Sequence, residues 1–546
     1  MALGPTQRTL LRGYGPLACL LLAFVLMAAF VPTDARERVT LAEGATGANG
    51  VPASTGSVGN GGSAASVPGA VKGSTTVSGA QVAQPGQLPA ETRKCSGKQV
   101  PGDPYSPQCI QFSGNNGGAT SRGVTSNTIT VAYRQTNDPG FQQTLAQIGG
   151  AQFADTPADV RRTIEGLADY FNKHFQFYGR KLKFDFYNGQ GSQTNELLGG
   201  GQEQASADAL HVASDIKAFA DMSAATEPYG DSLSRDKVLN FGEPYLSAKW
   251  FGDRSPYAWS LASDCTSVSE ATADIAVKQM LGKAAIYAGD ASFQKSKRKL
   301  AILAPDNPWY QDCVKNAEAI FKANGFGQQE AIPYQLDLST LSSQAASIVS
   351  KLKADHVTTV VCGCDPIFPV YLTQKADEQQ YDPEWAVIGV ALTDADIVGQ
   401  LFDQNEWKHA IGVTYQGPTM PYESTLGYAA YKSVRSDEPA QAVDIIYAQM
   451  YMLALGIDLA GPNLTPQSFL KGMQSYTGGT GEFGTWGFPA GDYTPTRDGA
   501  EIYWDPNAVS AYNGKQGAYV FASGRYQPGK WPEAAEPPHS PYKAAR

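Results

Sequence analysis

Basic residues are too few and too dispersed in this sequence to form a surface for nucleic acid. Lys and Arg number 42 against 52 Asp and Glu, which gives a formal net charge of −10. Contacts to a phosphate backbone require clustered Lys and Arg, and no basic patch is present. The composition therefore predicts that nucleic acid is not a partner.

Histidine is rarer still, and the common catalytic motifs are missing. The five His are scattered along 546 residues, whereas metal sites built from His and Cys need grouped ligands. The sequence contains no P-loop, no H-E-x-x-H and no G-x-S-x-G. We therefore predict no metal, no cofactor and no enzymatic activity.

Two short motifs nevertheless match enzyme signatures. Gly230-Asp-Ser-Leu233 spells the signature of the G-D-S-L hydrolases, whose serine needs a His base and an orienting acid. His539 lies in a Pro-rich tail without an Asp at that family's spacing, so we interpret Ser232 as a helix cap and keep an esterase as a minor alternative. Residues 479–484 fit G-x-G-x-x-G but open no helix, which favours a loop over a dinucleotide site.

The N-terminus has the pattern of an export signal. Arg8 and Arg12 precede an apolar run over residues 16–31, and small residues at 33 and 35 suit cleavage. An uncleaved membrane anchor is the alternative, since the run approaches the length of a span. Residues 36–92 are rich in Gly, Ala and Ser, which predicts a disordered linker. The chain is therefore expected outside the cytoplasm, secreted or tethered.

Seven cysteines are present, six of them beyond the signal region. An even number in an exported chain favours disulfides. Cys95 and Cys109 are expected to close a small loop. The other four, Cys265, Cys313, Cys362 and Cys364, allow three connectivities, and the C-G-C pair by itself also resembles a metal or redox motif.

From about residue 124, strand and helix patterns alternate. Apolar periodicity predicts the first strands and helix, and the stretch 189–201, rich in Gly and Gln, is expected to be an inserted loop. The predicted strands are 128–133, 181–187, 216–222 and 238–241, with a helix over 157–174.

The same alternation then starts again. The predicted strands are 299–304, 357–361 and 385–389, and the predicted helices are 266–280, 310–324, 341–354 and 369–379. Alternating strands and helices favour a parallel sheet covered on both faces. Two copies in tandem predict an α/β protein with two Rossmann-like lobes.

Several segments, in order, resemble the type I periplasmic binding proteins of the branch that binds leucine, isoleucine and valine. The similarity covers residues 124–528 and rests on the order of segments rather than on one motif. These segments are 123–131 (GVTSNTITV), 168–172 (ADYFN) with 178–184 (YGRKLKF), 299–310 (KLAILAPDNPWY), 341–355 and 410–414 (AIGVT).

This resemblance implies two lobes joined by a three-strand hinge, with a small-molecule ligand between them. It places lobe one at 124–262 and 413–490 and lobe two at 263–412 and 491–530. The segment 93–123 becomes a disulfide-containing lead-in, after the signal or anchor of 1–35, and 531–546 a tail. The implied function is that of a monomer that delivers its ligand to the membrane permease of an ABC importer. A ligand-sensing module for a membrane signalling partner is the alternative.

The resemblance also implies the ligand-binding residues, because open α/β sheets bind ligands beyond the carboxyl ends of their strands. In lobe one these are Tyr133, Ser223, Ala225, Thr226 and Tyr245; in lobe two they are Tyr310, Asp365 and Asp394. Where the amino-acid binders place an acid to pair with the α-ammonium group, this chain has Ala391. The ligand class is therefore left open among amino acids, amides and aromatic solutes.

The same alignment places the four later cysteines near the rim of lobe two. It leads to the hypothesis that Cys265 and Cys313 each form a disulfide with the C-G-C pair, which would stiffen that rim.

Overall fold

The computed structural model describes residues 92–136, 138, 155–243, 245–327, 329–495 and 498–534. The predicted signal or anchor segment lies outside these residues, as does the predicted linker apart from its last residue. Of the predicted tail, residues 531–534 are described, and Trp531 is 2% exposed and packs into a core cluster. The packed structure of lobe two therefore includes Trp531, the first residue of the predicted tail.

The lead-in is a hairpin closed by a disulfide. Strands β1 (Thr92–Lys98) and β2 (Gln108–Phe112) pair antiparallel, and Cys95 is bonded to Cys109 as expected. Between them, Tyr105 is fully buried against Phe483 and Trp486. The hairpin is therefore fastened to the core of lobe one.

Lobe one contains a five-stranded sheet in the order β4-β3-β5-β6-β7, and every neighbouring pair is parallel. The strands are β3 (Thr128–Gln135), β4 (Lys181–Asn188), β5 (Ala220–Asp221), β6 (Leu239–Phe241) and β7 (Ala258–Trp259). Among the described residues, the α-helices before the first crossing are α3 (Pro157–His174), α4 (Gln193–Leu197), α5 (Gln202–His211), α6 (Glu227–Arg235) and α7 (Ala248–Asp253).

A returning segment completes lobe one. It comprises α14 (Leu426–Lys432), α15 (Val443–Ala460), α16 (Pro466–Gln474) and the hairpin of β13 (Gly479–Gly481) and β14 (Gly484–Trp486). Helix α15 is long and apolar enough to cross a membrane, yet two thirds of it is buried, and it packs against α3, α14 and α16. Its composition is that of a core helix surrounded by other elements.

Lobe two is built on a seven-stranded sheet in the order β16-β15-β12-β11-β10-β8-β9. The five strands from β12 to β9 are parallel, whereas β15 and β16 are antiparallel additions. The strands are β8 (Leu300–Pro305), β9 (Glu330–Tyr334), β10 (Thr359–Cys362), β11 (Glu384–Val387), β12 (Ala410–Thr414), β15 (Gly499–Val509) and β16 (Gln516–Tyr526).

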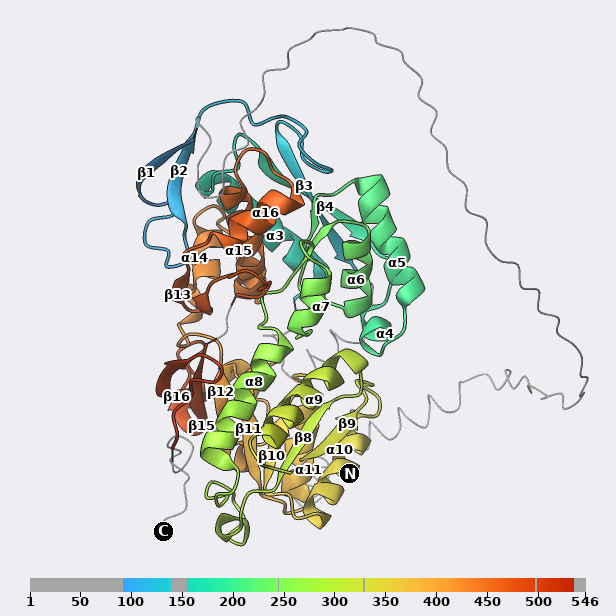
Figure 1. The fold of residues 1–546 in the computed structure, drawn as a ribbon, viewed down its shortest axis with the longest axis vertical. Coiled ribbons are helices and arrows are strands. Elements are labelled where there is room, and N and C mark those ends of the chain that lie inside the picture. Colours follow the sequence, from blue (N-terminus) through green and yellow to red (C-terminus); the bar gives the residue numbers. More distant parts are fainter. Residues whose placement is uncertain are drawn as a thin grey trace, which may run out of the picture. The chain divides into compact units, whose positions relative to one another are not determined.

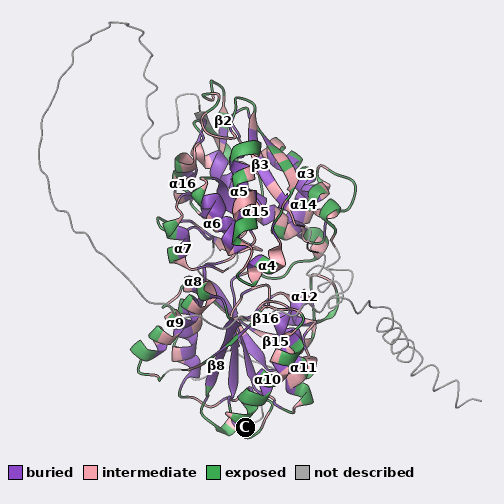
Figure 2. Ribbon diagram, turned by 90° about the vertical axis from the view of Figure 1, so that its right-hand side faces the viewer, coloured by how far each residue is buried: buried purple, intermediate pink, exposed green. Residues whose placement is uncertain are grey.

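Both faces of this sheet are covered, so its central strands are buried throughout (Figure 2). Along β8, Leu300 and Ile302 belong to one core cluster, and Ala301 and Leu303 belong to another, because successive side chains point to opposite faces. The first cluster packs on α8 (Cys265–Ile275) and α9 (Pro308–Ala323), which lie in front of the sheet in Figure 1. The second packs on α10 (Leu341–Ala354) and α11 (Phe368–Glu378). Two shorter helices follow β11, namely α12 (Asp396–Gly399) and α13 (Gln404–Trp407).

The chain passes between the two lobes three times: from β7 to α8, from β12 to α14 and from β14 to β15. The predicted α/β class with two parallel-sheet lobes is confirmed. Two predictions for the part of lobe one before the first crossing were wrong. The expected loop at 189–201 contains α4, and the strand expected at 216–222 is reduced to the two residues of β5 after a turn of π-helix ending at Ile216.

Candidate functional site

A hollow of about 350 Å³ lies in lobe two, on the face of the sheet covered by α8 and α9, and reaches the neighbouring lobe-one loops. We call it the apolar hollow, because aliphatic and aromatic side chains make up most of its wall. Its lobe-two wall includes Val268 and Thr272 of α8, Val314, Ala317 and Phe321 of α9, Ile302 of β8, Val361 of β10, and Leu336, Leu338 and Leu341. Ala225, Tyr245, Thr194 and Leu197 of lobe one border it as well.

Tyr245 connects the two lobes at this hollow. The backbone amides of Ala391 and Leu392 in lobe two donate toward its hydroxyl, and burial raises the pKa of Tyr245 above its usual range. All three residues adopt positive φ angles, of 34°, 50° and 59°. Non-glycine residues in this region carry a conformational cost and concentrate at functional sites. Ala391, which the resemblance implied stands where the amino-acid binders have an acid, thus contacts Tyr245 through its backbone amide.

Asp365 also borders the apolar hollow, but its carboxylate is already engaged. The Tyr334 hydroxyl donates to one oxygen at 2.6 Å, and the amides of Ile367 and Phe368 donate to the other at 2.8 and 3.0 Å. Burial nevertheless raises the pKa of Asp365. The residue therefore holds the start of α11 in place and is the one carboxylic acid among the described residues that line the hollow.

The cysteines beside this hollow pair differently from the hypothesis. Cys265 is bonded to Cys313, and Cys362 is bonded to Cys364 across a single glycine, so the expected cross-links to the C-G-C pair are wrong. The packing of two helices explains the Cys265–Cys313 bond. Helices α8 and α9 lie side by side and bring Cys265 and Cys313 to a Cα–Cα distance of 5.8 Å, within the range of a disulfide. Cys265, Cys313 and Cys364 all line the hollow.

A second hollow, of about 470 Å³, adjoins the first at Pro366, Ile367 and Leu392. We call it the acidic hollow, because its wall contains several carboxylates and, among the described residues, no Lys or Arg. The carboxylates belong to Asp138, Asp155, Asp394, Asp396, Asp444 and Glu482. Asp394, one of the predicted ligand-binding residues, lies here. Its carboxylate accepts from Thr414 Oγ1 at 2.6 Å and Gln416 Nε2 at 3.2 Å.

The remaining predicted residues of lobe one border neither hollow. The Ser223 hydroxyl donates to Asp221 and accepts from the Arg134 amide. Thr226 donates to Glu196, and Tyr133 packs on Phe186, with burial raising its pKa to about 12. The structure thus brings four of the predicted residues together at the apolar hollow, namely Ala225, Tyr245, Tyr310 and Asp365.

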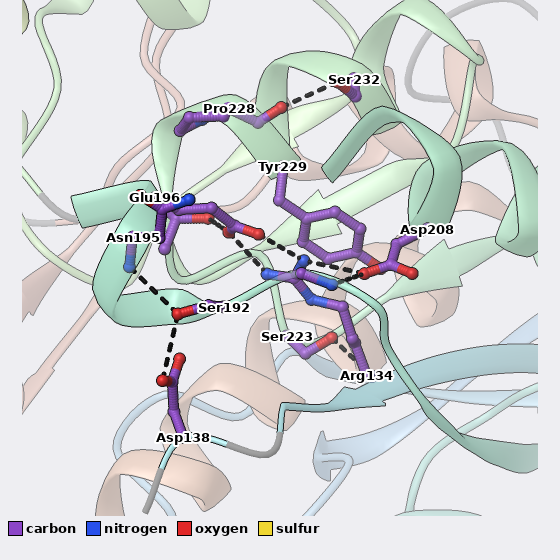
Figure 3. A network of polar contacts seen from close by, with 12 residues as sticks. Arg134, Asp138, Ser192, Asn195, Glu196, Asp208, Ser223, Pro228, Tyr229 and Ser232 are labelled. Atoms are coloured by element: carbon purple, nitrogen blue, oxygen red, sulfur yellow. Dashed lines mark hydrogen bonds and ion pairs between the residues drawn. The ribbon is translucent and has the colours of Figure 1, made fainter. Parts of the chain in front are cut away.

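A buried ionic network fixes the elements of lobe one beside these hollows (Figure 3). Arg134, at the end of β3, makes two hydrogen bonds of 2.8 Å to the carboxylate of Glu196 and one of 3.2 Å to Asp208. Its guanidinium group also lies 3.7 Å from the centre of the Tyr229 ring. Because Glu196 belongs to α4, this network holds Thr194 and Leu197 at the mouth of the apolar hollow.

The two enzyme-like motifs have structural roles. Ser232 lies inside α6 rather than at its N-cap, so the predicted cap is wrong. Its hydroxyl donates to Pro228 O and contacts Ser206 and Arg235, and none of these contacts among the described residues involves histidine. Residues 479–484 form the β13–β14 hairpin in place of the expected loop. The described part of the chain holds no cluster of three metal-ligating side chains.

Sequence reasoning missed most of the wall of the apolar hollow. Val314, Phe321 and Leu341 have the spacing of core-facing helical residues, which predicts burial but gives no sign of an unfilled space. Leu197 lies in the stretch expected to be a loop. Ser192 was the available signal for a helix at this place, because its side chain caps α4 by accepting from the Asn195 amide.

The fold and the site together define a two-lobed receptor for a small molecule. The family model described as periplasmic binding protein matches residues 148–508, and the chain belongs to this family. Membership implies a small-molecule ligand and an extracytoplasmic location. No curated protein sequence matches the chain.

Among solved structures, the chain is similar to an ABC-transporter solute-binding protein from R. palustris in complex with 4-hydroxybenzoate. The TM-score is 0.51 at 12% identity, covering 75% of this chain and 98% of that one. A substrate-binding protein from Aeropyrum pernix gives 0.51 at 15%, covering 74% and 96%. A fatty acid transporter's substrate-binding protein from Thermomonospora curvata gives 0.50 at 14%, covering 74% and 94%. At this identity the likeness is one of fold.

Proposed function

We propose that this protein is an exported solute-binding component of an ABC-type importer, which captures a small molecule between its lobes and delivers it to the membrane permease. The observation that carries the proposal is the apolar hollow, whose wall comes from both lobes and whose two sides meet at the Tyr245 contact. Three crossings join the lobes, and such connections allow hinge closure around a ligand.

Within this proposal Tyr245 positions one lobe against the other, while Ala225 and Tyr310 contact the ligand. The proposal assigns no catalytic group. The 4-hydroxybenzoate and the fatty acid named for two similar structures support an organic solute with a substantial apolar part.

The test is native mass spectrometry of the purified protein, followed by a thermal-shift screen of amino acids, aromatic acids, amides and lipids. A ligand at 100 times its Kd adds about 2.7 kcal/mol to the free energy of unfolding. Absence of any co-purified molecule together with absence of any shift would contradict the proposal.

A variant pair tests the role of Tyr245 in capture. Tyr245→Phe removes the hydroxyl that accepts from lobe two, and should weaken the ligand found in the screen by about twofold to tenfold, the range for one hydrogen bond. Tyr428→Phe removes a hydroxyl that contacts Glu438 on the surface and should leave the affinity unchanged. Equal affinities for the two variants would remove Tyr245 from the mechanism.

A further inference from the structure

We infer that the apolar hollow accepts an uncharged, mainly aliphatic or alicyclic molecule that carries a hydroxyl or carbonyl group. This inference rests on the proposed function and assigns the chemical class of its ligand.

The first argument is the charge of the wall. Among the described residues, the lining contains no Lys, Arg or His, and Asp365 is its one carboxylic acid. A ligand carboxylate would enter without a cation to pair with and would lie near a second carboxyl group. Moving an unpaired ion from water into such a space is strongly unfavourable.

A cationic ligand is disfavoured for a related reason. The two oxygens of Asp365 already accept three hydrogen bonds from Tyr334, Ile367 and Phe368. The carboxylate is therefore turned toward its own loop and the start of α11. An ammonium group in the hollow would have to displace one of these donors.

The third argument is a buried hydroxyl on one residue of the wall. Thr272 Oγ1 is buried and has no hydrogen-bond partner among the described residues, although Thr272 lines the hollow. Buried hydroxyls are normally hydrogen-bonded. A ligand hydroxyl or carbonyl beside Thr272 would satisfy it, while Val314, Phe321 and Leu341 cover the apolar remainder.

The experiment uses straight-chain probes on the full chain. Binding of 1-hexanol, 1-octanol and 1-decanol is measured by displacement of the uncharged dye N-phenyl-1-naphthylamine, with decanoate and decylammonium as charged probes of equal length. Affinity should rise by up to about fourfold per methylene, which corresponds to ~0.8 kcal/mol for each buried CH₂, until the hollow is full. Decanoate and decylammonium should bind at least about tenfold more weakly than decanol. Decanoate or decylammonium binding as well as decanol would overturn the inference.

Variants on one helix locate the binding. Ala317 is 7% exposed on the hollow side of α9, and Ala319 is exposed on the same helix. Ala317→Leu fills part of the hollow and should lower the affinity for decanol about tenfold, whereas Ala319→Leu should leave that affinity unchanged. Equal decanol affinity in both variants would place the alcohol elsewhere and overturn the inference.

A second, nearly isosteric variant guards against misfolding of the first. Thr272→Val should weaken the binding of decanol by about twofold to tenfold and leave the binding of the dye unaffected; unchanged decanol affinity would overturn the hydroxyl assignment.

Failure of the inference can be told apart from failure of the proposed function. If a charged polar solute raises the melting temperature and Ala317→Leu does not affect it, only the ligand class is wrong. If no solute of any class binds, capture itself is wrong.

Discussion

Replacing Glu196 by Gln should destabilise the protein far more than an equivalent change on its surface. The Glu196 and Arg134 side chains are 0% and 2% exposed, and their two hydrogen bonds measure 2.8 Å. Gln keeps the shape but removes the negative charge and presents an N–H group to a guanidinium that only donates. Breaking one partner of a buried ion pair costs about 3–5 kcal/mol.

The chain supplies a matched control in Glu165→Gln. Glu165 pairs with Arg161 at 2.9 Å, nearly the same distance, but the side chains are 46% and 53% exposed. An exposed i,i+4 pair contributes about 0.3–0.5 kcal/mol. Residue type, substitution and distance are alike, and the pairs differ in burial and in the extra hydrogen bonds that the buried Glu196 accepts from Arg134 and Thr226.

The assay is urea unfolding followed by tryptophan fluorescence at pH 7. The expected free energy of unfolding is lower by about 3–5 kcal/mol for Glu196→Gln and by less than about 0.5 kcal/mol for Glu165→Gln. A second readout is ligand affinity, which should fall only for Glu196→Gln, because α4 carries Thr194 and Leu197 at the apolar hollow. A loss below about 1 kcal/mol for Glu196→Gln would refute the reasoning that burial sets the energy of this pair.

Two further predictions concern stability. Burial raises the pKa of Asp458 to about 7, so the folded state keeps a proton that the unfolded chain loses near pH 4. This contribution is complete below pH 4 and is lost as pH rises to 7, by about 4 kcal/mol at ~1.4 kcal/mol per pKa unit. Asp458→Asn should reduce the fall in the free energy of unfolding between urea melts at pH 5 and 8, while half-buried Glu482, whose pKa is also raised, keeps its contribution; an unchanged fall would contradict the prediction. Separately, a Cβ at Gly412 of β12 would overlap the backbone of Val387, so Gly412→Ala should lower the free energy of unfolding by about 1–3 kcal/mol. Gly252→Ala, in α7 with open space around it, should raise that energy by about 0.5–1 kcal/mol; equal effects in calorimetry would refute the steric argument.

The periodic elements of this protein were predictable because each depends on its own residues. The helix over 157–174 begins after a capping box at Thr156, carries Pro at its first turn, and matches its prediction residue for residue. The helix over 341–354 matches equally well. The segment 410–414, which the family resemblance singled out, forms strand β12. Alternation of such segments was enough to predict two α/β lobes, since parallel strands need helical connections.

Elements that depend on distant partners were missed. Helix α4 is five residues long, too short to be stable alone, and Glu196 holds it through Arg134, 62 positions earlier. The strand at β5 contributes only two residues to the ladder, although seven were predicted. In both cases the tertiary neighbour, and not the local sequence, sets where the element begins and ends.

The sequence by itself determined the lobes, their tandem order and the loops after the strands, because hydrophobic periodicity encodes which residues face a core. Only the tertiary structure decided the pairing of the four later cysteines, since the packing of α8 on α9 brings Cys265 within bonding distance of Cys313. It also decided which loop residues meet. Ala225, Tyr245, Tyr310 and Asp365 border the apolar hollow, whereas Ser223 and Thr226 are engaged by Asp221 and Glu196. A hollow is space left between side chains of several elements, and no local pattern of residues records it.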